Sequence, residues 1–232
     1  MSADRLKRAA AEAAVALVQP GMLVGLGTGS TANHAITLLG ERYRDGLRFT
    51  GVPTSLATAS LARACGIPLI EQPTGAPIDL TIDGADEISA SDLSLIKGMG
   101  GALLWEKIVA TASRAVVIIA DDTKLAPRLS GHVPVPVEIV EFGWQSTLAR
   151  LAMPGCHPEL KCDDFGEAFR TDAGHRIVNC RFDDLSDPAA VERALSMIVG
   201  VVETGLFIGL ATTALIASPA GVRRIGRGNA AF

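Results

Sequence analysis

The sequence of 232 residues predicts an α/β protein with a main domain and a smaller α+β subdomain. In the main domain we expect a largely parallel, Rossmann-like sheet with helices on both faces. Three observations favour this architecture. Short apolar runs of strand length alternate with helical patterns in the first half of the chain. These runs lack a polar alternate face, which is typical of parallel strands buried on both sides. Prolines interrupt the alternation after Lys124 and mark a border between domains.

The first half of the chain supplies the main domain. Apolar residues at helical spacing predict a helix over about 6–17, and Pro20 with Gly21 ends it. The expected strands that follow are Met22–Leu26, Phe49–Val52, Ile67–Ile70, Leu80–Ile82 and Val116–Ile119. The expected helices between them are Ala32–Arg44 and Leu56–Cys65. A helix is also expected after the glycine turn near position 100.

The smaller subdomain is expected at 131–205. Its expected strands are Val135–Val140, Glu159–Cys162 and Ile177–Phe182, and its expected helices are Trp144–Leu151 and Ala189–Met197. The later apolar runs, Leu206–Leu210 and Thr213–Ala217, are apolar enough to return to the main sheet. The predicted main domain therefore comprises 1–130 and 206–232.

Composition excludes several classes of protein. Apolar residues make up 48% of the chain, which excludes disorder, and 21 basic against 25 acidic residues give a net charge of −4. Without a basic cluster we expect no nucleic-acid partner. No apolar run reaches the roughly 18 residues of a membrane span, and the N-terminus lacks a signal-peptide layout, so we expect a cytoplasmic protein without a membrane partner. Four cysteines without a CxxC pair predict reduced thiols. The spacing of Cys156, His157, Cys162 and Cys180 matches no familiar zinc site, so no metal is expected.

The glycine-rich segment GLGTGST, at Gly25–Thr31, follows an expected strand and opens an expected helix. Backbone N–H groups and the helix dipole favour an anion at such a point. The loop offers glycines that permit close approach and hydroxyl donors, namely Gly25, Gly27, Gly29, Thr28, Ser30 and Thr31. Ser30 stands where the dinucleotide pattern GxGxxG requires glycine, and no Walker lysine follows, so a monophosphate fits better than NAD or ATP. The alternative is a glycine turn with an ordinary serine cap.

The acidic segment DGADE, at Asp83–Glu87, follows the expected strand Leu80–Ile82. Its acids therefore emerge at a strand end, where open α/β sheets place their sites. Asp83 and Asp86 are three positions apart, a spacing that lets a tight turn present both to one cavity. The alternatives are capping of a turn or helix, and magnesium binding.

The segment KGMGGALLWEK, at Lys97–Lys107, combines a second glycine turn with a helix-forming stretch. Glu106 lies beside Trp105 among apolar residues that disfavour its ionised form, which suits a general base. Lys97 is placed to stabilise negative charge on an oxygen. The alternative for the glutamate is an exposed helix face. DDTKL places Lys124 at another strand end, where a solvated lysine is the alternative.

In this order the motifs resemble those of the type A family of ribose-5-phosphate isomerases. The motifs that carry the resemblance are GTGST, PTS at Pro53–Ser55, DGADE, KGMGGALLWEK, DDTKL and GLFIGLA at Gly205–Ala211. The resemblance runs from the first helix almost to the C-terminus. It implies reversible isomerisation of D-ribose 5-phosphate to D-ribulose 5-phosphate through an enediolate, in the non-oxidative pentose phosphate pathway. It also implies no metal or organic cofactor, and a homodimer or a dimer of dimers.

The resemblance further implies residue roles. Glu106 is the base, Asp83 binds sugar hydroxyls and helps to open the furanose ring, and Lys97 stabilises the growing oxygen charge. The other implied substrate contacts are Lys7, Gly27, Thr28, Gly29, Ser30, Thr31, Gly84, Ala85, Asp86, Gly98, Met99, Gly100 and Lys124. Two departures stand out: Met99 replaces a glycine, and Leu104 with Trp105 replaces a Thr-Arg pair, so we expect altered access to substrate. The alternative functions are a non-catalytic sugar-phosphate effector domain and an acyl or CoA transferase, although a transferase would require a much longer chain.

Overall fold

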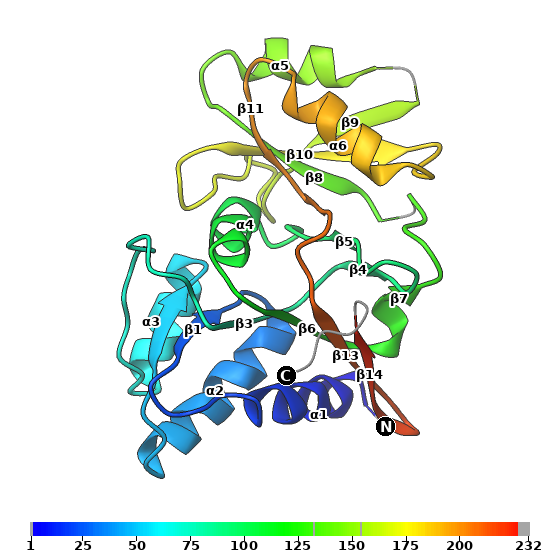
Figure 1. Ribbon diagram of the computed structural model, residues 1–232. Coiled ribbons are helices and arrows are strands. Elements are labelled where there is room, and N and C mark those ends of the chain that lie inside the picture. The colour runs from blue at the N-terminus through cyan, green and yellow to red at the C-terminus, as the bar shows by residue number, and fades with distance from the viewer. Residues whose placement is uncertain (1, 132, 154, 227–232) are drawn as a thin grey trace. The chain divides into compact units, whose positions relative to one another are not determined.

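The computed structural model describes residues 2–131, 133–153 and 155–226 (Figure 1). The chain forms two compact units. Unit 1 comprises Met1–Ala85, Trp105–Leu125 and Gly209–Phe232, and unit 2 comprises Asp86–Leu104 and Ala126–Ile208. Two of the borders between the units fall inside motifs noted above, one within DGADE and one within KGMGGALLWEK.

Unit 1 is built on a six-stranded sheet in the order β14-β13-β6-β3-β1-β2. The strands are β1 (Leu23–Leu26), β2 (Thr50–Pro53), β3 (Leu80–Asp83), β6 (Val116–Asp121), β13 (Thr213–Ser218) and β14 (Gly221–Gly226). All neighbouring pairs are parallel except β13 with β14. The apolar runs predicted this largely parallel sheet, and the structure confirms it.

Serine side chains cap two of the helices of unit 1. The helices of this unit are α1 (Ala3–Val15), α2 (Ser30–Arg44) and α3 (Leu56–Ala64), together with the part of α4 (Leu103–Thr111) from Trp105 onward. The Ser2 hydroxyl accepts a hydrogen bond from the N–H of Arg5 at the start of α1, and Ser55 caps α3 in the same way through Thr58.

Helices cover both faces of this sheet. Leu6, Ala10 and Ile36 of α1 and α2 share one buried apolar cluster with the inner sides of the strands. On the other face, Val109 of α4 packs with Val52 of β2 and with Ile78. The apolar parallel strands of the sheet are therefore buried, whereas the edge strand β14 is exposed.

The strand order places the two leading motifs next to each other. β1 lies between β2 and β3, so the chain turns to opposite sides of β1 when it forms these two strands. In open α/β sheets, ligands bind beyond the carboxyl ends of the strands at such a switch point. GLGTGST begins with the last two residues of β1, and DGADE begins with the last residue of β3. The residues of unit 1 that follow these strands therefore lie at this point of the sheet.

Unit 2 contains a four-stranded antiparallel sheet in the order β11-β8-β10-β9. Its strands are β8 (Val135–Ile139), β9 (Cys156–Leu160), β10 (Arg176–Phe182) and β11 (Val201–Thr204), and its helices are α5 (Trp144–Leu151) and α6 (Pro188–Ser196). The core includes Val137, Leu151, Val178 and Leu195. This arrangement confirms the predicted α+β subdomain.

A second four-stranded sheet, in the order β12-β5-β4-β7, was not predicted. Its strands are β4 (Glu87–Ser89), β5 (Leu95–Ile96), β7 (Leu125–Ala126) and β12 (Leu206–Phe207), and the 3-10 helix η1 (Asp122–Lys124) precedes β7. Each strand is too short to show a periodicity in the sequence. Residues 86–104 belong to unit 2 because β4 and β5 pair in this sheet, whereas the predicted division put them in the main domain.

Two other strand predictions were wrong. The run Leu206–Leu210 does not return to the main sheet, because Leu206 and Phe207 pair with β5. The run Ile67–Ile70 makes only a single bridge, between Leu69 and Gly51. The strand predicted at Glu159–Cys162 is found at Cys156–Leu160, which starts three residues earlier and ends two residues earlier. Residues 227–232 of the predicted main domain lie outside the described residues.

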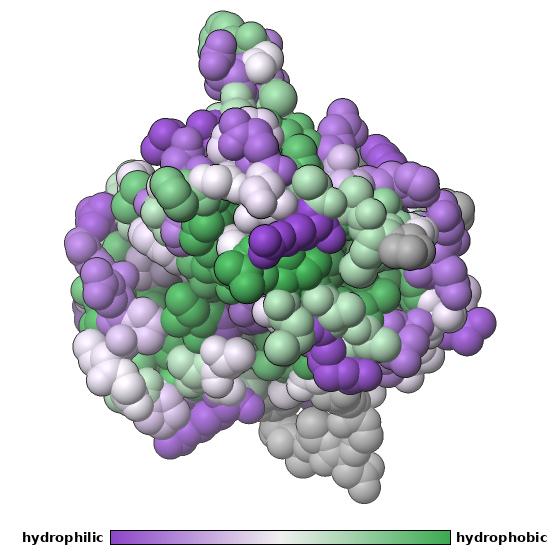
Figure 2. Space-filling view, turned by 90° about the horizontal axis from the view of Figure 1, so that it is seen from above, coloured by the Kyte–Doolittle hydropathy of each residue, from purple (hydrophilic) through white to green (hydrophobic). Residues whose placement is uncertain are grey.

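No described helix is long and apolar enough to cross a membrane. Apolar and hydrophilic residues are interspersed on the face shown in Figure 2. Among the large apolar side chains that are exposed, four belong to unit 2, namely Phe142, Phe165, Met197 and Val199.

Candidate active site

The glycine-rich loop after β1 is packed directly against β3. A Cβ atom on Gly27 would lie 2.2 Å from Asp83 Oδ1, and a Cβ atom on Gly25 would lie 1.9 Å from Thr81 Oγ1. No side chain fits at such distances, so these two positions require glycine. The backbone N–H of Gly27 donates to the carbonyl of Ile82 at 2.9 Å, which fixes the loop to the end of β3.

The amino end of α2 has the features of an anion site. Gly29 is the N-cap, with φ of 109°, and no side chain caps the helix there. Ser30 and Gly29 are exposed and Thr31 is half-buried. Lys7 of α1 donates to Ser30 Oγ at 2.9 Å, which brings a cation to the loop. A helix dipole, backbone N–H groups and a lysine at one point favour a phosphate.

Thr28 lies at the centre of a hydroxyl network. Its Oγ1 lies 2.8 Å from Thr54 Oγ1, 2.9 Å from Ser55 Oγ and 3.0 Å from Thr58 Oγ1. Thr54 and Thr58 in turn donate to the carbonyls of Leu26 and Gly27, both at 2.9 Å. The Thr28 hydroxyl is therefore directed into the protein, where it holds the loop. The sequence indicated the PTS motif but not this network.

Asp83 ends β3 and is 2% exposed. Its Oδ1 accepts from the backbone N–H groups of Thr28 at 3.2 Å and of Gly84 at 2.7 Å. The carboxylate thus joins the glycine-rich loop to the DGADE turn, in which Gly84 and Ala85 are half-buried. The first residues of DGADE therefore lie next to the glycine-rich loop within unit 1.

Glu106 lies in the first turn of α4 and is only 4% exposed. The alternative of an exposed glutamate on a helix face is therefore wrong. The amino-terminal end of a helix stabilises a negative charge. A carboxylate that is both buried and placed at such a helix end has the character of a positioned base.

Lys124 lies in η1, directly after β6, and is half-buried. β6 is the parallel neighbour of β3, so its carboxyl end lies at the same edge of the sheet as that of β3. The preceding turn is held by Asp121, whose Oδ1 accepts from the N–H of Thr123 at 3.1 Å. Unit 1 therefore carries Lys124 at the edge that also carries the glycine-rich loop.

Unit 2 carries the other predicted site residues on the turn 97–101. Lys97 is 3% exposed, its N–H donates to the carbonyl of Gly205 at 2.9 Å, and its Nζ lies 5.5 Å from the centre of the Phe207 ring. Gly98 and Gly101 have φ of 102° and 85°, which favour glycine, and the N–H of Gly101 donates to the carbonyl of Gly98 at 2.8 Å. Met99 is half-buried and Gly100 is exposed.

The Met99 backbone is held by two charged side chains. Its N–H donates to Asp86 Oδ2 at 3.0 Å, and its carbonyl accepts from Lys161 Nζ. The predicted site included Asp86 but missed Lys161, which is 62 positions from Met99 along the chain. Burial lowers the pKa of Lys161, and the charge of Asp86 opposes this shift.

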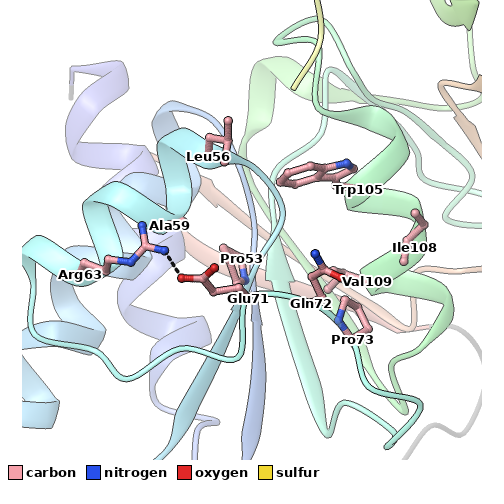
Figure 3. Close-up of a pocket in the computed structure, with 10 residues that line it drawn as sticks. All are labelled: Pro53, Leu56, Ala59, Arg63, Glu71, Gln72, Pro73, Trp105, Ile108 and Val109. Carbon is pink, nitrogen blue, oxygen red and sulfur yellow. Dashed lines mark hydrogen bonds and ion pairs between the residues drawn. The ribbon is translucent and has the colours of Figure 1, made fainter. Parts of the chain in front are cut away.

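Trp105 faces a pocket in unit 1 that Figure 3 shows. The pocket has a volume of about 440 Å³ and lies between α3 and α4. Its lining residues are Pro53, Leu56, Ala59, Arg63, Glu71, Gln72, Pro73, Trp105, Ile108 and Val109, with an ion pair between Arg63 and Glu71. Glu106 is not among them. We therefore expect Trp105 to alter access to this pocket.

All four cysteines are free, as predicted. Among the described residues, no group of three or more His, Cys, Asp and Glu side chains could hold a metal ion. His157 instead pairs with Asp183 at 2.9 Å.

The parallel sheet, the start of α2 without a side-chain cap and the Asp83 carboxylate at the sheet edge are typical of an α/β enzyme that binds a small phosphorylated molecule. The family model of ribose 5-phosphate isomerase A (phosphoriboisomerase A) matches residues 50–221. The chain belongs to this family.

The relatives extend over nearly the whole chain. The ribose-5-phosphate isomerase A of Gloeobacter violaceus is 51% identical over 222 residues, which cover 96% of each chain. The solved ribose 5-phosphate isomerase A of Methanocaldococcus jannaschii has a TM-score of 0.92 and is 35% identical, with 97% of this chain and 100% of that chain covered. Another solved D-ribose-5-phosphate isomerase, in complex with phospho-erythronic acid, has a TM-score of 0.93 and is 33% identical, with 98% and 100% covered.

Proposed function

We propose that this family member interconverts D-ribose 5-phosphate and D-ribulose 5-phosphate through an enediolate, with Glu106 as the base. The observation that carries the proposal is the buried carboxylate of Glu106 in the first turn of α4. The resemblance of the motifs assigned this role to the same residue. The reaction serves the non-oxidative pentose phosphate pathway.

The chemistry requires one group that moves a proton. In the open-chain aldose, Glu106 removes the proton from C2, and the C1 carbonyl oxygen takes up negative charge as the enediolate forms. The protonated glutamic acid then delivers the proton to C1, while the proton of the C2 hydroxyl passes to the C1 oxygen. Ribulose 5-phosphate results, with Glu106 ionised again and no atom gained or lost.

Lys97 would stabilise the negative charge that grows on the oxygens. A buried ammonium acts strongly on a nearby charge because little water screens it. Lys97 is 3% exposed, and the glycines at 98 and 101 shape the turn that follows it. We expect the backbone of Gly98, Met99 and Gly100 to contact the same part of the substrate.

The phosphate would bind at the amino end of α2. Gly29, Ser30 and Thr31 would supply backbone or hydroxyl donors there, and Lys7 supplies a positive charge. Gly27, whose N–H is already donated to the carbonyl of Ile82, would let the loop approach the substrate closely. Thr28 would contribute indirectly, because its N–H donates to Asp83 and its hydroxyl network holds the loop in place. A phosphate fixed at a helix start orients the rest of a five-carbon substrate.

The two aspartates of DGADE would bind the sugar hydroxyls. Asp83, which is buried at the end of β3, would also take part in opening the furanose ring. Asp86, Gly84 and Ala85 extend this contact, and Lys124 adds a further one.

We further propose a cytoplasmic homodimer or dimer of dimers that needs neither a metal nor an organic cofactor. The resemblance of the motifs to the isomerase family supports this proposal.

Hydrogen exchange at C2 tests the proposal directly. The protein is incubated with ribose 5-phosphate in deuterated water, and loss of the C2 hydrogen is followed by NMR. We expect deuterium to enter the sugar together with formation of ribulose 5-phosphate. A non-catalytic effector domain would bind the sugar phosphate without exchange, and that result would refute the proposal.

A further inference from the structure

Lys161 follows β9 and reaches the turn 97–101 through its side chain. Its Nζ donates to the carbonyl of Met99 and lies 4.9 Å from the centre of the Phe169 ring. The backbone holds this arrangement, because the N–H of Phe169 donates to the carbonyl of Lys161 at 2.9 Å. The ammonium is therefore directed by an aromatic ring and by the backbone hydrogen bond between Phe169 and Lys161.

The same turn is held from two further sides. Asp86 Oδ2 accepts from the N–H of Met99 at 3.0 Å. A Cβ atom on Gly101 would lie 2.3 Å from the Phe169 ring, so the ring packs directly on the turn. Both ends of the Met99 residue thus have charged partners, and the turn is closed by an aromatic side chain.

The peptide that follows Met99 transmits this constraint. The Met99 carbonyl and the Gly100 N–H belong to one planar trans peptide group, in which they point in opposite directions. When Lys161 fixes the carbonyl, the N–H of Gly100 is fixed as well. A cation on the carbonyl oxygen also polarises the peptide and makes this N–H a stronger donor.

We propose that Lys161 is a positioning residue, which orients the Gly100 N–H toward the substrate oxygen that gains negative charge. The inference rests on the proposed function, because it assigns Gly100 to the isomerisation. A preorganised backbone donor for a developing negative charge lowers the barrier of the chemical step more than it strengthens substrate binding.

The surroundings of Lys161 support a charge that acts locally. Its side chain is half-buried, and burial lowers its pKa while the charge of Asp86 raises it. Less water around the ammonium means less screening of its effect on the Met99 carbonyl.

Variants at Lys161 test the inference by separating kcat from KM. Lys161→Met removes the charge at nearly constant shape, and we expect kcat to fall roughly tenfold, about 1.4 kcal/mol, with KM nearly unchanged. Lys161→Arg should recover most of kcat because the cation returns. Arg181→Met is the matched control, since Arg181 is an exposed cation on β10 of the same unit, and it should behave as the wild type. Lys161→Gln serves as a second neutral variant if Lys161→Met does not fold.

Hydrogen exchange of the backbone amides supplies a second measurement. We expect faster exchange at Met99, Gly100 and Gly101 in Lys161→Met, with no change in the Arg181→Met control. The inference would be overturned if Lys161→Met kept the wild-type kcat. It would also be overturned if Lys161→Met and the control Arg181→Met lost kcat equally. Failure of the wild type to exchange the C2 hydrogen would instead refute the proposed function, while the amide exchange would still show whether Lys161 holds the turn.

Discussion

Gly27→Ala is expected to damage both stability and activity, because the added methyl group meets β3. Its Cβ would lie 2.2 Å from Asp83 Oδ1 and 2.6 Å from Asp83 Cα, whereas real Cβ contacts are essentially never under 3.0 Å. The carboxylate must therefore move by at least 3.0 − 2.2 = 0.8 Å, and the backbone of β3 by at least 3.0 − 2.6 = 0.4 Å. The hydrogen bond from the N–H of Thr28 to Asp83 Oδ1, at 3.2 Å, is expected to break.

The size of the effect follows from this displacement. Overpacking of this kind costs about 1–3 kcal/mol of the free energy of unfolding. If Asp83 binds the substrate as proposed, a shift of almost 1 Å in its carboxylate costs about 100-fold in kcat/KM. Urea unfolding measures the first quantity, and a coupled assay of ribulose 5-phosphate formation measures the second.

Gly21→Ala provides the matched control. Gly21 has φ of 84°, and nothing lies within 4 Å of its added Cβ. The control therefore has only backbone strain, roughly 1–2 kcal/mol, and should keep the wild-type kcat/KM. The reasoning is refuted if Gly27→Ala also keeps the wild-type kcat/KM, or if its free energy of unfolding is unchanged.

Three further variants test other contacts. Lys7→Met should raise KM about tenfold with kcat nearly unchanged, because the proposed phosphate contact is made equally in the ground state and the transition state. The control Arg8→Met should leave kcat and KM unchanged. Thr58→Val should lose about 1–2 kcal/mol in urea unfolding, because its hydroxyl holds the glycine-rich loop, while Ser60→Ala on the exposed side of α3 should lose less than about 0.5 kcal/mol. Burial raises the pKa of Glu138 above its ordinary value of 4.5, so the folded state binds this proton more tightly than the unfolded state. The free energy of unfolding is measured against pH for the wild type and for Glu138→Gln. As the pH rises from 4.5 through the raised pKa, the wild type should lose stability relative to the variant. A difference in free energy that stays constant with pH would contradict this.

Much of the fold was predictable because the signals are local. The helix Trp144–Leu151 was predicted with the bounds that the structure has, since its apolar spacing lies within one segment. The two apolar runs at Ile67–Ile70 and Leu206–Leu210 were assigned wrongly for the opposite reason. Their pairing depends on which strand edge is available, and that edge is made by distant segments.

Site residues were predictable where a motif lies at the end of a predicted strand. Asp83 follows a strand and approaches the glycine-rich loop because the two parallel strands are neighbours. Thr58 and Lys161 were missed because their partners are far along the chain, 30 positions away for Thr28 and 62 for Met99. The sequence around a threonine or a lysine contains no pattern that predicts such long-range hydrogen bonds.

The central claim is that the carboxylate of Glu106 moves the proton, and Glu106→Gln tests it most directly. The glutamine amide is nearly the same size as the carboxylate but cannot accept the C2 proton. The variant therefore separates substrate binding from proton transfer. We expect ribose 5-phosphate to bind with nearly wild-type affinity in calorimetry, while exchange of the C2 hydrogen and turnover fall by roughly 10²–10⁴-fold. Near-normal turnover in this variant would contradict the account.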